Sequence, residues 1–186
     1  MNPQTMRRFI TVNEYHSMGE RGIFKENEHL ELIDGEIINM APIGSRHASC
    51  VDRLNELFVT HLTGKAIVRV QNPVYLNEYS ELEPDIAITK RYEKAYITKH
   101  PEPKDIYLIV EVADTSINFD REVKVPLYAK AGIIEVWLVD LNENSIEIYQ
   151  KPVNEKYCAI CKKYGAEIVS PLSFPDYKIT INKLLC

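Results

Sequence analysis

The segment 105–113 constrains the fold more than any other part of the chain. It reads Asp-Ile-Tyr-Leu-Ile-Val-Glu-Val-Ala, which is nearly continuous in apolar residues. Such a run is typical of a strand that is covered on both faces by other elements. A carboxylate inside a buried strand costs several kcal/mol unless it is paired, hydrogen-bonded or metal-bound. The chain must therefore supply packing layers on both faces of a sheet and a partner for Glu111.

Capping and turn patterns predict the elements before this strand. Thr11-Val-Asn-Glu14 is a capping-box pattern, and we expect a first helix from Thr11 that ends before Gly19. Asp34-Gly35 lies between two apolar runs, 28–33 and 36–40, and predicts a β-hairpin because both turn residues need positive φ. Ser45 is the expected N-cap of a second helix, which runs to about Thr63 with one apolar stripe.

The rest of the chain is predicted to alternate strands with one further helix. We expect a helix from Asn118 or Asp120 through Lys130, closed by Gly132, with a kink near Pro126 because proline removes one backbone donor. The strands are expected over 66–76, 85–88, 105–113, 135–141, 145–150, 157–163 and 177–181. This order predicts an α/β (or α+β) fold with a mixed central sheet flanked by helices and an N-terminal hairpin.

Composition bounds the class of protein. The chain has 186 residues, 45% hydrophobic and 26% charged, which excludes global disorder and favours a single domain over 1–186. The net charge of −5 argues against a surface coated in positive charge, although a local basic groove remains compatible with it. The first twenty residues contain no apolar signal region, and the longest apolar run, Ile106–Val110, is far too short to span a membrane. We therefore expect a cytoplasmic protein that does not associate with membranes.

The four cysteines are expected to be thiols in such a compartment. Cys158-Ala-Ile-Cys161 has the spacing of half a zinc site, but no second Cys/His pair follows at ligand spacing. If this segment is a strand, the two thiols point to opposite faces. The spacing therefore favours two ordinary cysteines over a structural zinc site.

Two carboxylates interrupt apolar strands and form the candidate site. Pro84-Asp85 opens Asp-Ile-Ala-Ile, and alternation places Asp85 and Ala87 on one face, while Glu111 shares a face with Ile109 and Ala113. If the two strands are neighbours, Asp85 and Glu111 converge, and a hard divalent cation would relieve their repulsion. Taken alone, Asp85 is equally compatible with a strand-end carboxylate in water, and Glu111 with a solvent-facing residue of an edge strand.

These residues carry a family resemblance. Pro84-Asp85 followed by Glu111-Val112-Ala113 resembles the PD-(D/E)XK nuclease superfamily, although Ala113 stands where the usual motif has lysine. The stretches 120–132 and 135–140 are similar to the Uma-type family of restriction-endonuclease-like proteins, in which the lysine lies on the helix after the acidic strand. Lys124 is the matching residue. The hairpin 31–36 with Tyr15, Gly44-Ser-Arg-His47 and Gln71-Asn-Pro73 extend the resemblance from about Phe9 to Gln150, with a looser match to Cys186.

The resemblance implies a restriction-endonuclease-like fold and a Mg²⁺- or Mn²⁺-dependent endonuclease. It implies that Asp85, Glu111 and the backbone carbonyl of Val112 bind the metal, and that Lys124 positions the attacking water. Glu31 would be an accessory carboxylate, because it shares a face with Ile33 and pairs across the hairpin with Ile38.

Each of the remaining candidates also has a plain structural interpretation. Lys124 can be an exposed lysine paired with Asp120, and Glu31 a surface residue of a short hairpin. His47, in the first turn of its helix, can contact phosphate or simply face solvent. Gln71 can hold water or a base edge near the site, or can be a satisfied strand glutamine.

We therefore expect an endodeoxyribonuclease that acts on DNA. The alternative is a non-catalytic nucleic-acid-binding or regulatory protein on the same fold, which the displaced lysine and the acidic net charge favour. A homodimer is also expected, because two-fold pairs are the commonest oligomers and each chain offers one site for one strand. The apolar stretch Ile179–Leu185 could form such an interface, or it could pack in the chain's own core.

Overall fold

The computed structural model describes residues 7–92, 94 and 96–185. Its elements follow one another as α1 (Val12–Glu20), β1 (Leu30–Ile33), β2 (Glu36–Asn39), α2 (Ser45–Leu62), β3 (Ala66–Val70), β4 (Val74–Asn77), β5 (Ser80–Leu82), β6 (Ile86–Lys90), η1 (Pro103–Asp105), β7 (Ile106–Ala113), α3 (Ile117–Phe119), η2 (Asp120–Lys124), α4 (Val125–Ala131), β8 (Glu135–Asp140), β9 (Ser145–Val153), β10 (Lys156–Tyr164), β11 (Ile168–Val169), β12 (Ile179–Thr180) and α5 (Ile181–Leu184).

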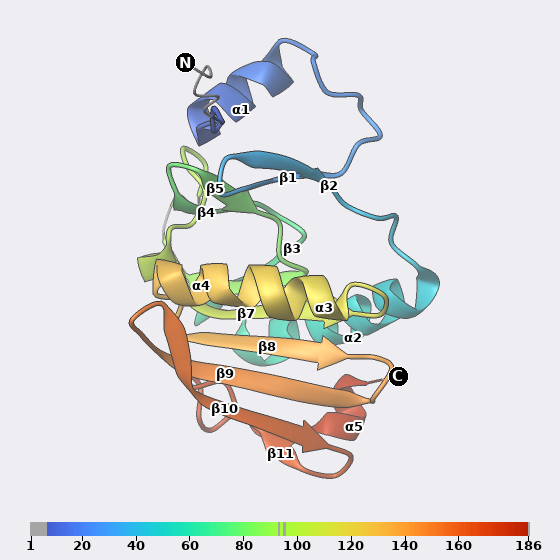
Figure 1. Ribbon diagram of the computed structural model, residues 1–186. Coiled ribbons are helices and arrows are strands. Elements are labelled where there is room, and N and C mark those ends of the chain that lie inside the picture. The colour runs from blue at the N-terminus through green and yellow to red at the C-terminus, as the bar shows by residue number, and fades with distance from the viewer. Residues whose placement is uncertain (1–6, 93, 95, 186) are drawn as a thin grey trace.

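A six-stranded sheet forms the centre of the fold. Its order is β10-β9-β8-β7-β6-β3, and every neighbouring pair is antiparallel except β7 and β8, which are parallel. A smaller antiparallel sheet has the order β2-β1-β5-β4, and β11 pairs with β12. Figure 1 shows the smaller sheet beyond one edge of the central sheet, with α1 on its outer side. The sheet is mixed and flanked by helices, as the element order predicts.

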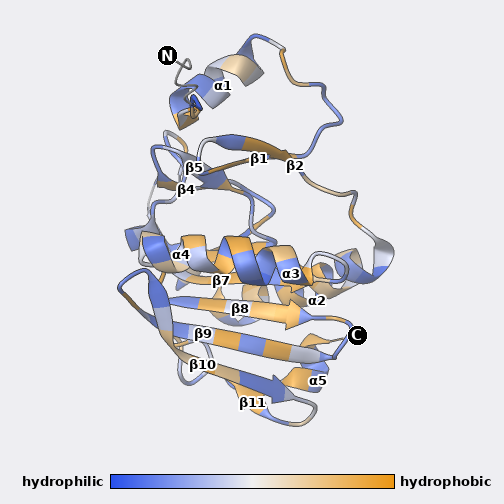
Figure 2. Cartoon of the chain, viewed as in Figure 1, coloured by the Kyte–Doolittle hydropathy of each residue, from blue (hydrophilic) through white to orange (hydrophobic). Residues whose placement is uncertain are grey.

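The two faces of the central sheet pack against different layers. On one face Ile86, Ile88 and Val110 contact α2 and the C-terminal segment. On the other face Ala87 and Ile109 contact the continuous helical segment α3–η2–α4 and the small sheet. Figure 2 shows the result in hydropathy, with β7 and β8 mostly apolar where both faces are covered. The alternation inferred for the acidic strands therefore holds.

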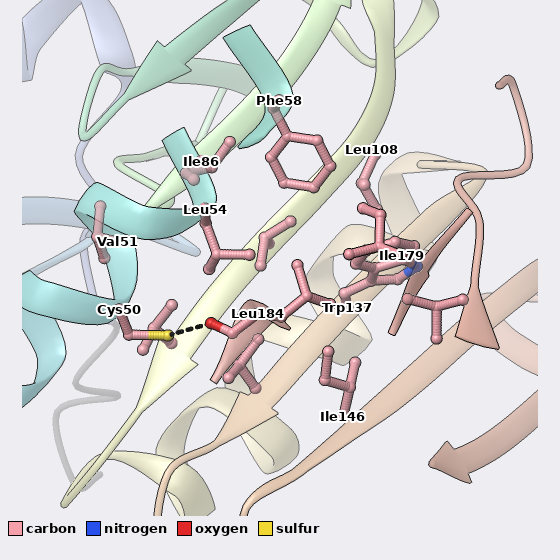
Figure 3. Close-up of a cluster of buried hydrophobic side chains, with 14 of the residues drawn as sticks. Cys50, Val51, Leu54, Phe58, Ile86, Leu108, Trp137, Ile146, Ile179 and Leu184 are labelled. Atoms are coloured by element: carbon pink, nitrogen blue, oxygen red, sulfur yellow. Dashed lines mark hydrogen bonds between the residues drawn. The ribbon is translucent and has the colours of Figure 1, made fainter. Parts of the chain in front are cut away.

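The core under α2 is built from large side chains that exclude water (Figure 3). Phe58 and Trp137 are fully buried with ring centroids 6.1 Å apart, and each contributes about 1.5–3 kcal/mol by burial alone. The C-terminal residues Ile179, Leu184 and Leu185 are buried in the same cluster. The apolar C-terminus is thus used inside its own chain, and the homodimer remains a prediction without support from this segment.

The N-terminal hairpin forms where Asp34-Gly35 predicts it. The register pairs Glu31 with Ile38, and both turn residues have positive φ, 45° at Asp34 and 79° at Gly35. Gly35 also lies against the incoming chain, because a Cβ there would lie 2.5 Å from the Cβ of Phe9. The first helix begins as expected, with Thr11 and Glu14 forming a complete capping box.

The helix around Pro126 contains a wide turn. It starts at Ile117, so neither Asn118 nor Asp120 is its N-cap, and it ends at Gly132 as expected. The turn Asp120–Lys124 is π-helical, with the Val125 N–H bonded to the Asp120 carbonyl five residues earlier. Proline has no N–H for the carbonyl four residues before it and clashes with that carbonyl, so one extra residue in the turn accommodates Pro126 without breaking the helix.

Several local predictions are corrected. The strand expected over 66–76 is interrupted, because Gln71 adopts a positive φ of 48° and the chain crosses from the central sheet to the small one. Gly44, and not Ser45, is the N-cap of α2. The last strand is shorter than expected, since Ile181 starts α5.

The described cysteines are all thiols. Cys50 is buried and donates to the Leu184 carbonyl, Cys158 and Cys161 are exposed on β10, and Cys186 lies outside the described residues. Within residues 7–92, 94 and 96–185, no helix has the length and apolar character needed to cross a bilayer.

Candidate active site

The pairing of β6 with β7 brings Asp85 and Glu111 together. Ile86 lies opposite Val110, so the preceding Asp85 meets the position of Glu111. The Asp85 N–H lies 3.4 Å from Glu111 Oε2, and the Val112 N–H donates to Asp85 Oδ2 over 2.8 Å. Both residues are buried, and both lie on the face covered by α3–η2–α4. The solvent-facing interpretations of Asp85 and Glu111 are therefore set aside.

Lys124 enters the same space from the π-helical turn. Its side chain is 4% exposed, and Nζ donates to Glu31 Oε1 over 3.0 Å and lies 3.4 Å from Glu111 Oε1. This is not the exposed lysine that an i,i+4 pair with Asp120 would give. The helix thus brings an ammonium group to the carboxylates, while Ala113 on β7 carries none.

Glu31 reaches the site from the small sheet. Its Oε1 accepts from Lys124 and from the Glu83 N–H, 3.2 Å away. Its Oε2 is buried without a hydrogen-bond partner among the residues that the structure describes. The structure buries Glu31 almost completely, at 3% exposure, so the surface interpretation of this residue is wrong. An acceptor oxygen is therefore available inside the site.

His47 and Gln71 flank Asp85 on its outer side. His47 Nε2 lies 2.9 Å from Asp85 Oδ2, and Gln71 Nε2 lies 3.4 Å from Asp85 Oδ1. The hydrogen bond with Asp85 is the main cause that raises the pKa of His47, which favours its positively charged form. His47 Nδ1 has no partner within the described part of the chain. Both side chains are therefore next to the carboxylates.

The site includes two residues that sequence reasoning did not assign to it. Asp120 is buried, and its Oδ2 accepts from the Ser116 hydroxyl over 2.6 Å. Tyr128 is fully buried, and its hydroxyl donates to Glu111 Oε1 over 2.5 Å. Asp120, Lys124 and Tyr128 follow one another at intervals of four, so the common helix face was the signal that could have found them.

Burial sets the charge states inside the site. Desolvation raises the pKa of Glu111 to about 8. The positive charge of Lys124 acts to lower this pKa but does not offset the effect of burial. Desolvation also acts to lower the pKa of Lys124, but the carboxylates of Glu111, Glu31 and Asp120 outweigh it and the pKa rises above its ordinary value. Lys124 is therefore a cation at neutral pH, and the site contains more acidic groups than it can hold ionised without another cation.

These groups line one cavity. It has a volume of about 480 Å³, and its wall includes Glu31, Asp85, Glu111 and Lys124 together with His47. Gln71, Asp120 and Val112 also line it. The cavity therefore brings the predicted site residues to one place. They come from β1, α2, β7 and η2, from the segment between β3 and β4, and from the residue just before β6.

The donor set fits a hard divalent cation. Asp85 and Glu111 offer carboxylate oxygens, and oxygen ligands are those that Mg²⁺ and Mn²⁺ prefer. Among the residues that the structure describes, Asp85 Oδ1 has only the long contact with Gln71, so it retains lone pairs for a ligand. The raised pKa of Glu111 is what a carboxylate shows when burial is not offset by enough positive charge. A bound cation would provide that charge.

Comparisons with known proteins identify the family and the fold. The sequence model of the Uma2 family, described as "Putative restriction endonuclease", matches residues 12–182, which confirms the resemblance inferred from the motifs. A crystal structure of "a putative nuclease belonging to DUF820" from Anabaena variabilis is similar in fold, with a TM-score of 0.76 and 17% sequence identity. The match covers 94% of this chain and 97% of that one, and it confirms the fold. No curated protein matches the chain.

Proposed function

The chain belongs to the Uma2 family of restriction-endonuclease-like proteins, and on that premise we propose that it is a divalent-metal-dependent nuclease that hydrolyses phosphodiester bonds of DNA. The observation that carries the proposal is the placement of Lys124, buried between Glu31 and Glu111 although β7 lacks a lysine. In the sequence, the absence of a lysine from β7 favours a non-catalytic binder. In the structure, the Lys124 ammonium group lies 3.4 Å from Glu111, so a lysine on η2 can take the role of the missing lysine on β7.

Asp85, Glu111 and the carbonyl of Val112 are the proposed ligands of Mg²⁺ or Mn²⁺. When bound, the cation supplies positive charge beside the scissile phosphate and makes a coordinated water more acidic. Asp85 is held for this task by the Val112 N–H and by His47. Tyr128 fixes Glu111 by donating to Oε1, which leaves Oε2 turned toward the backbone of Asp85.

Lys124 and Glu31 are proposed to handle the attacking water. Lys124 is a cation, so it acts as a donor and not as a base: it orients the water and stabilises negative charge that develops on the phosphate. An ammonium group has three donors, and Glu31 Oε1 takes one of them. Glu31 Oε2, which has no partner among the described residues, accepts a hydrogen bond from the same water on its other side.

His47 and Gln71 are proposed to contact the substrate. His47 lies in the first turn of α2, and its hydrogen bond with Asp85 favours the imidazolium form. A cation at a helix N-terminus is suited to a phosphate, because helix N–H groups add to its charge. Gln71 lies on the other side of Asp85, where its amide can contact a neighbouring phosphate or base edge.

The test is cleavage of supercoiled plasmid and of DNA and RNA oligonucleotides with Mg²⁺ or Mn²⁺. Glu111→Gln and Lys124→Gln should each reduce cleavage by about 100-fold or more, which is the usual effect of removing one charge-stabilising group. Glu122→Gln and Lys130→Gln change the same residue types at exposed positions of η2 and α4 and should leave cleavage unchanged.

Three results would contradict the proposal. The first is cleavage that persists in Glu111→Gln. The second is binding that weakens with salt in the absence of any cleavage by the intact protein, which would support the non-catalytic nucleic-acid binder. The third is cleavage of RNA alone, which would keep the mechanism but replace the substrate.

A further inference from the structure

Three potential metal ligands meet outside the carboxylate cavity. His16 comes from α1, Glu81 from β5 and His100 from the segment between β6 and η1, and one ligand atom of each lies within 4.8 Å of the other two. His16 Nε2 is 2.6 Å from Glu81 Oε1, and the two histidine ring centroids are 6.1 Å apart. Within the described ranges it is the one group of three or more such side chains with this spacing.

Glu81 supplies the second observation. Its side chain is only 5% exposed, yet Oε2 is buried without a hydrogen-bond partner among the residues that the structure describes. Buried polar atoms nearly always have a partner, because an unsatisfied carboxylate oxygen loses its hydration without compensation. The orphan oxygen therefore points to a ligand that this cluster is built to hold.

The cluster lies on the opposite side of the small sheet from the nuclease site. Glu81 pairs with Leu32 across β1 and β5, so the two share a face. Glu31 is the neighbour of Leu32 and points to the other face, toward Lys124. The ligands of one site therefore cannot reach the other, and α1 covers the outer face in Figure 1.

We propose that His16, Glu81 and His100 bind a zinc-class transition-metal ion that fastens α1 and the segment before η1 to the small sheet. Two imidazole nitrogens and one carboxylate oxygen are a common zinc ligand set, whereas Mg²⁺ prefers oxygen ligands throughout. The ion takes the place of the proton that His16 and Glu81 share, and this proton moves to the other ring nitrogen or to water. His16 is 43% exposed, which leaves room for water as the fourth ligand.

The surroundings are compatible with this role. Without the ion, the polar contacts between α1 and the small sheet include the Tyr15 hydroxyl to the Leu30 carbonyl, the Val12 N–H to the Glu78 carbonyl, and His16 Nε2 with Glu81 Oε1. Arg69, whose charge acts on His100, has its guanidinium over the Tyr96 ring, 5.5 Å from the ring centroid. The segment carrying His100 is fixed beside β4, because the Tyr75 N–H donates to the Pro101 carbonyl. The three ligands therefore need only small side-chain movements to close around an ion.

The test is titration of the chelator-treated full-length chain with Co²⁺ and Zn²⁺. Co²⁺ should give the intense visible bands of a tetrahedral site at one equivalent, and Zn²⁺ should displace it while excess Mg²⁺ should not. Glu81→Gln and His100→Ala should each weaken Zn²⁺ binding by about 100-fold or more, since even losses in the outer shell of a metal site cost 10–100-fold. The matched control is His61→Ala, which removes an exposed imidazole on α2.

Two further arms make each outcome decisive. Glu111→Gln should keep the cobalt spectrum, which separates this site from the nuclease site, and Glu81→Gln should keep Mn²⁺-dependent cleavage. Because glutamine has the shape of glutamate, Glu81→Gln should fold, and its circular dichroism spectrum verifies this. An absence of the bands in the wild-type chain, or bands that survive in both Glu81→Gln and His100→Ala, would overturn the proposal.

Discussion

Replacing Glu111 by glutamine should abolish metal-dependent cleavage and yet make the metal-free protein less sensitive to alkaline pH. The pKa of this buried carboxyl group is raised to about 8 from 4.5. Between these two values the folded protein keeps a proton that the unfolded chain has released. The stabilisation is therefore complete below pH 4.5, and it is lost as the pH rises through about 8.

The size of the effect follows from the same pKa. One pH unit changes the free energy of unfolding by about 1.4 kcal/mol for one proton, so wild type should lose roughly 2 kcal/mol between pH 6 and 8 through Glu111. Glutamine cannot ionise, so Glu111→Gln lacks this loss. Below pH 4.5, where Glu111 is protonated in both the folded and the unfolded chain, the two proteins should differ by less than about 1 kcal/mol, because glutamine and a protonated glutamate have similar shape and polarity. At pH 6 the unfolded wild-type chain has already released this proton, so Glu111→Gln should be more stable than wild type by roughly 2 kcal/mol.

The assay is urea unfolding in chelating buffer at pH 6, 7, 8 and 9. The chain has one tryptophan, Trp137, which is fully buried, so its fluorescence reports the loss of the core. Glu122→Gln, at an exposed position of η2, should follow wild type at every pH. Adding Mn²⁺ at pH 8 should raise the stability of wild type and not that of Glu111→Gln. Parallel pH profiles for wild type and Glu111→Gln would refute the reasoning.

Three other substitutions separate the roles of neighbouring groups. Lys124→Gln should destabilise the protein by about 3–5 kcal/mol at pH 8, because it leaves buried carboxylates without their cation. Lowering the pH protonates these carboxylates and should restore part of the lost stability, and urea unfolding measures both effects. Tyr128→Phe removes the hydroxyl that donates to Glu111 and should cost about 1–3 kcal/mol by the same measurement, with a smaller loss of cleavage than Glu111→Gln. Gly35→Ala should lower the free energy of unfolding by at least about 1–2 kcal/mol because of the positive φ alone, and the displacement of Phe9 should lower it further. Thermal unfolding should show this loss, while the cleavage rate per folded molecule should not change.

Much of the fold was predictable because it depends on local chemistry. Asp34-Gly35 specifies its turn through two positive φ values, and alternation along two strands was enough to bring Asp85 and Glu111 to the same face. The break at Gln71 was not predictable, since glutamine gives no signal for a positive φ. The three-residue strand β5 was missed for a related reason, because it is too short for a periodic pattern.

The site was predictable in part. The position of Lys124 came from a family resemblance, since its spacing alone indicated only a surface pair with Asp120. Its burial depends on the π-helical turn Asp120–Lys124. Pro126 predicts a kink in this helix but not the type or the position of the turn. His16, Glu81 and His100 were invisible to sequence reasoning, because ligands from three separate segments have no characteristic spacing.

The span between Glu31 and Lys124 also bears on when the proposed activity can arise. The two residues are 93 positions apart, whereas Asp85 and Glu111 are 26 apart. Closing the longer loop costs about 1 kcal/mol more chain entropy, so in a chain that is still folding the carboxylate pair is favoured to assemble first. On the ribosome, Lys124 is also synthesised after Glu31, Asp85 and Glu111, and domains form as their sequence emerges. A nascent chain therefore has the proposed metal ligands before it has the lysine proposed to position water, which would delay the proposed cleavage until the chain has folded around Lys124.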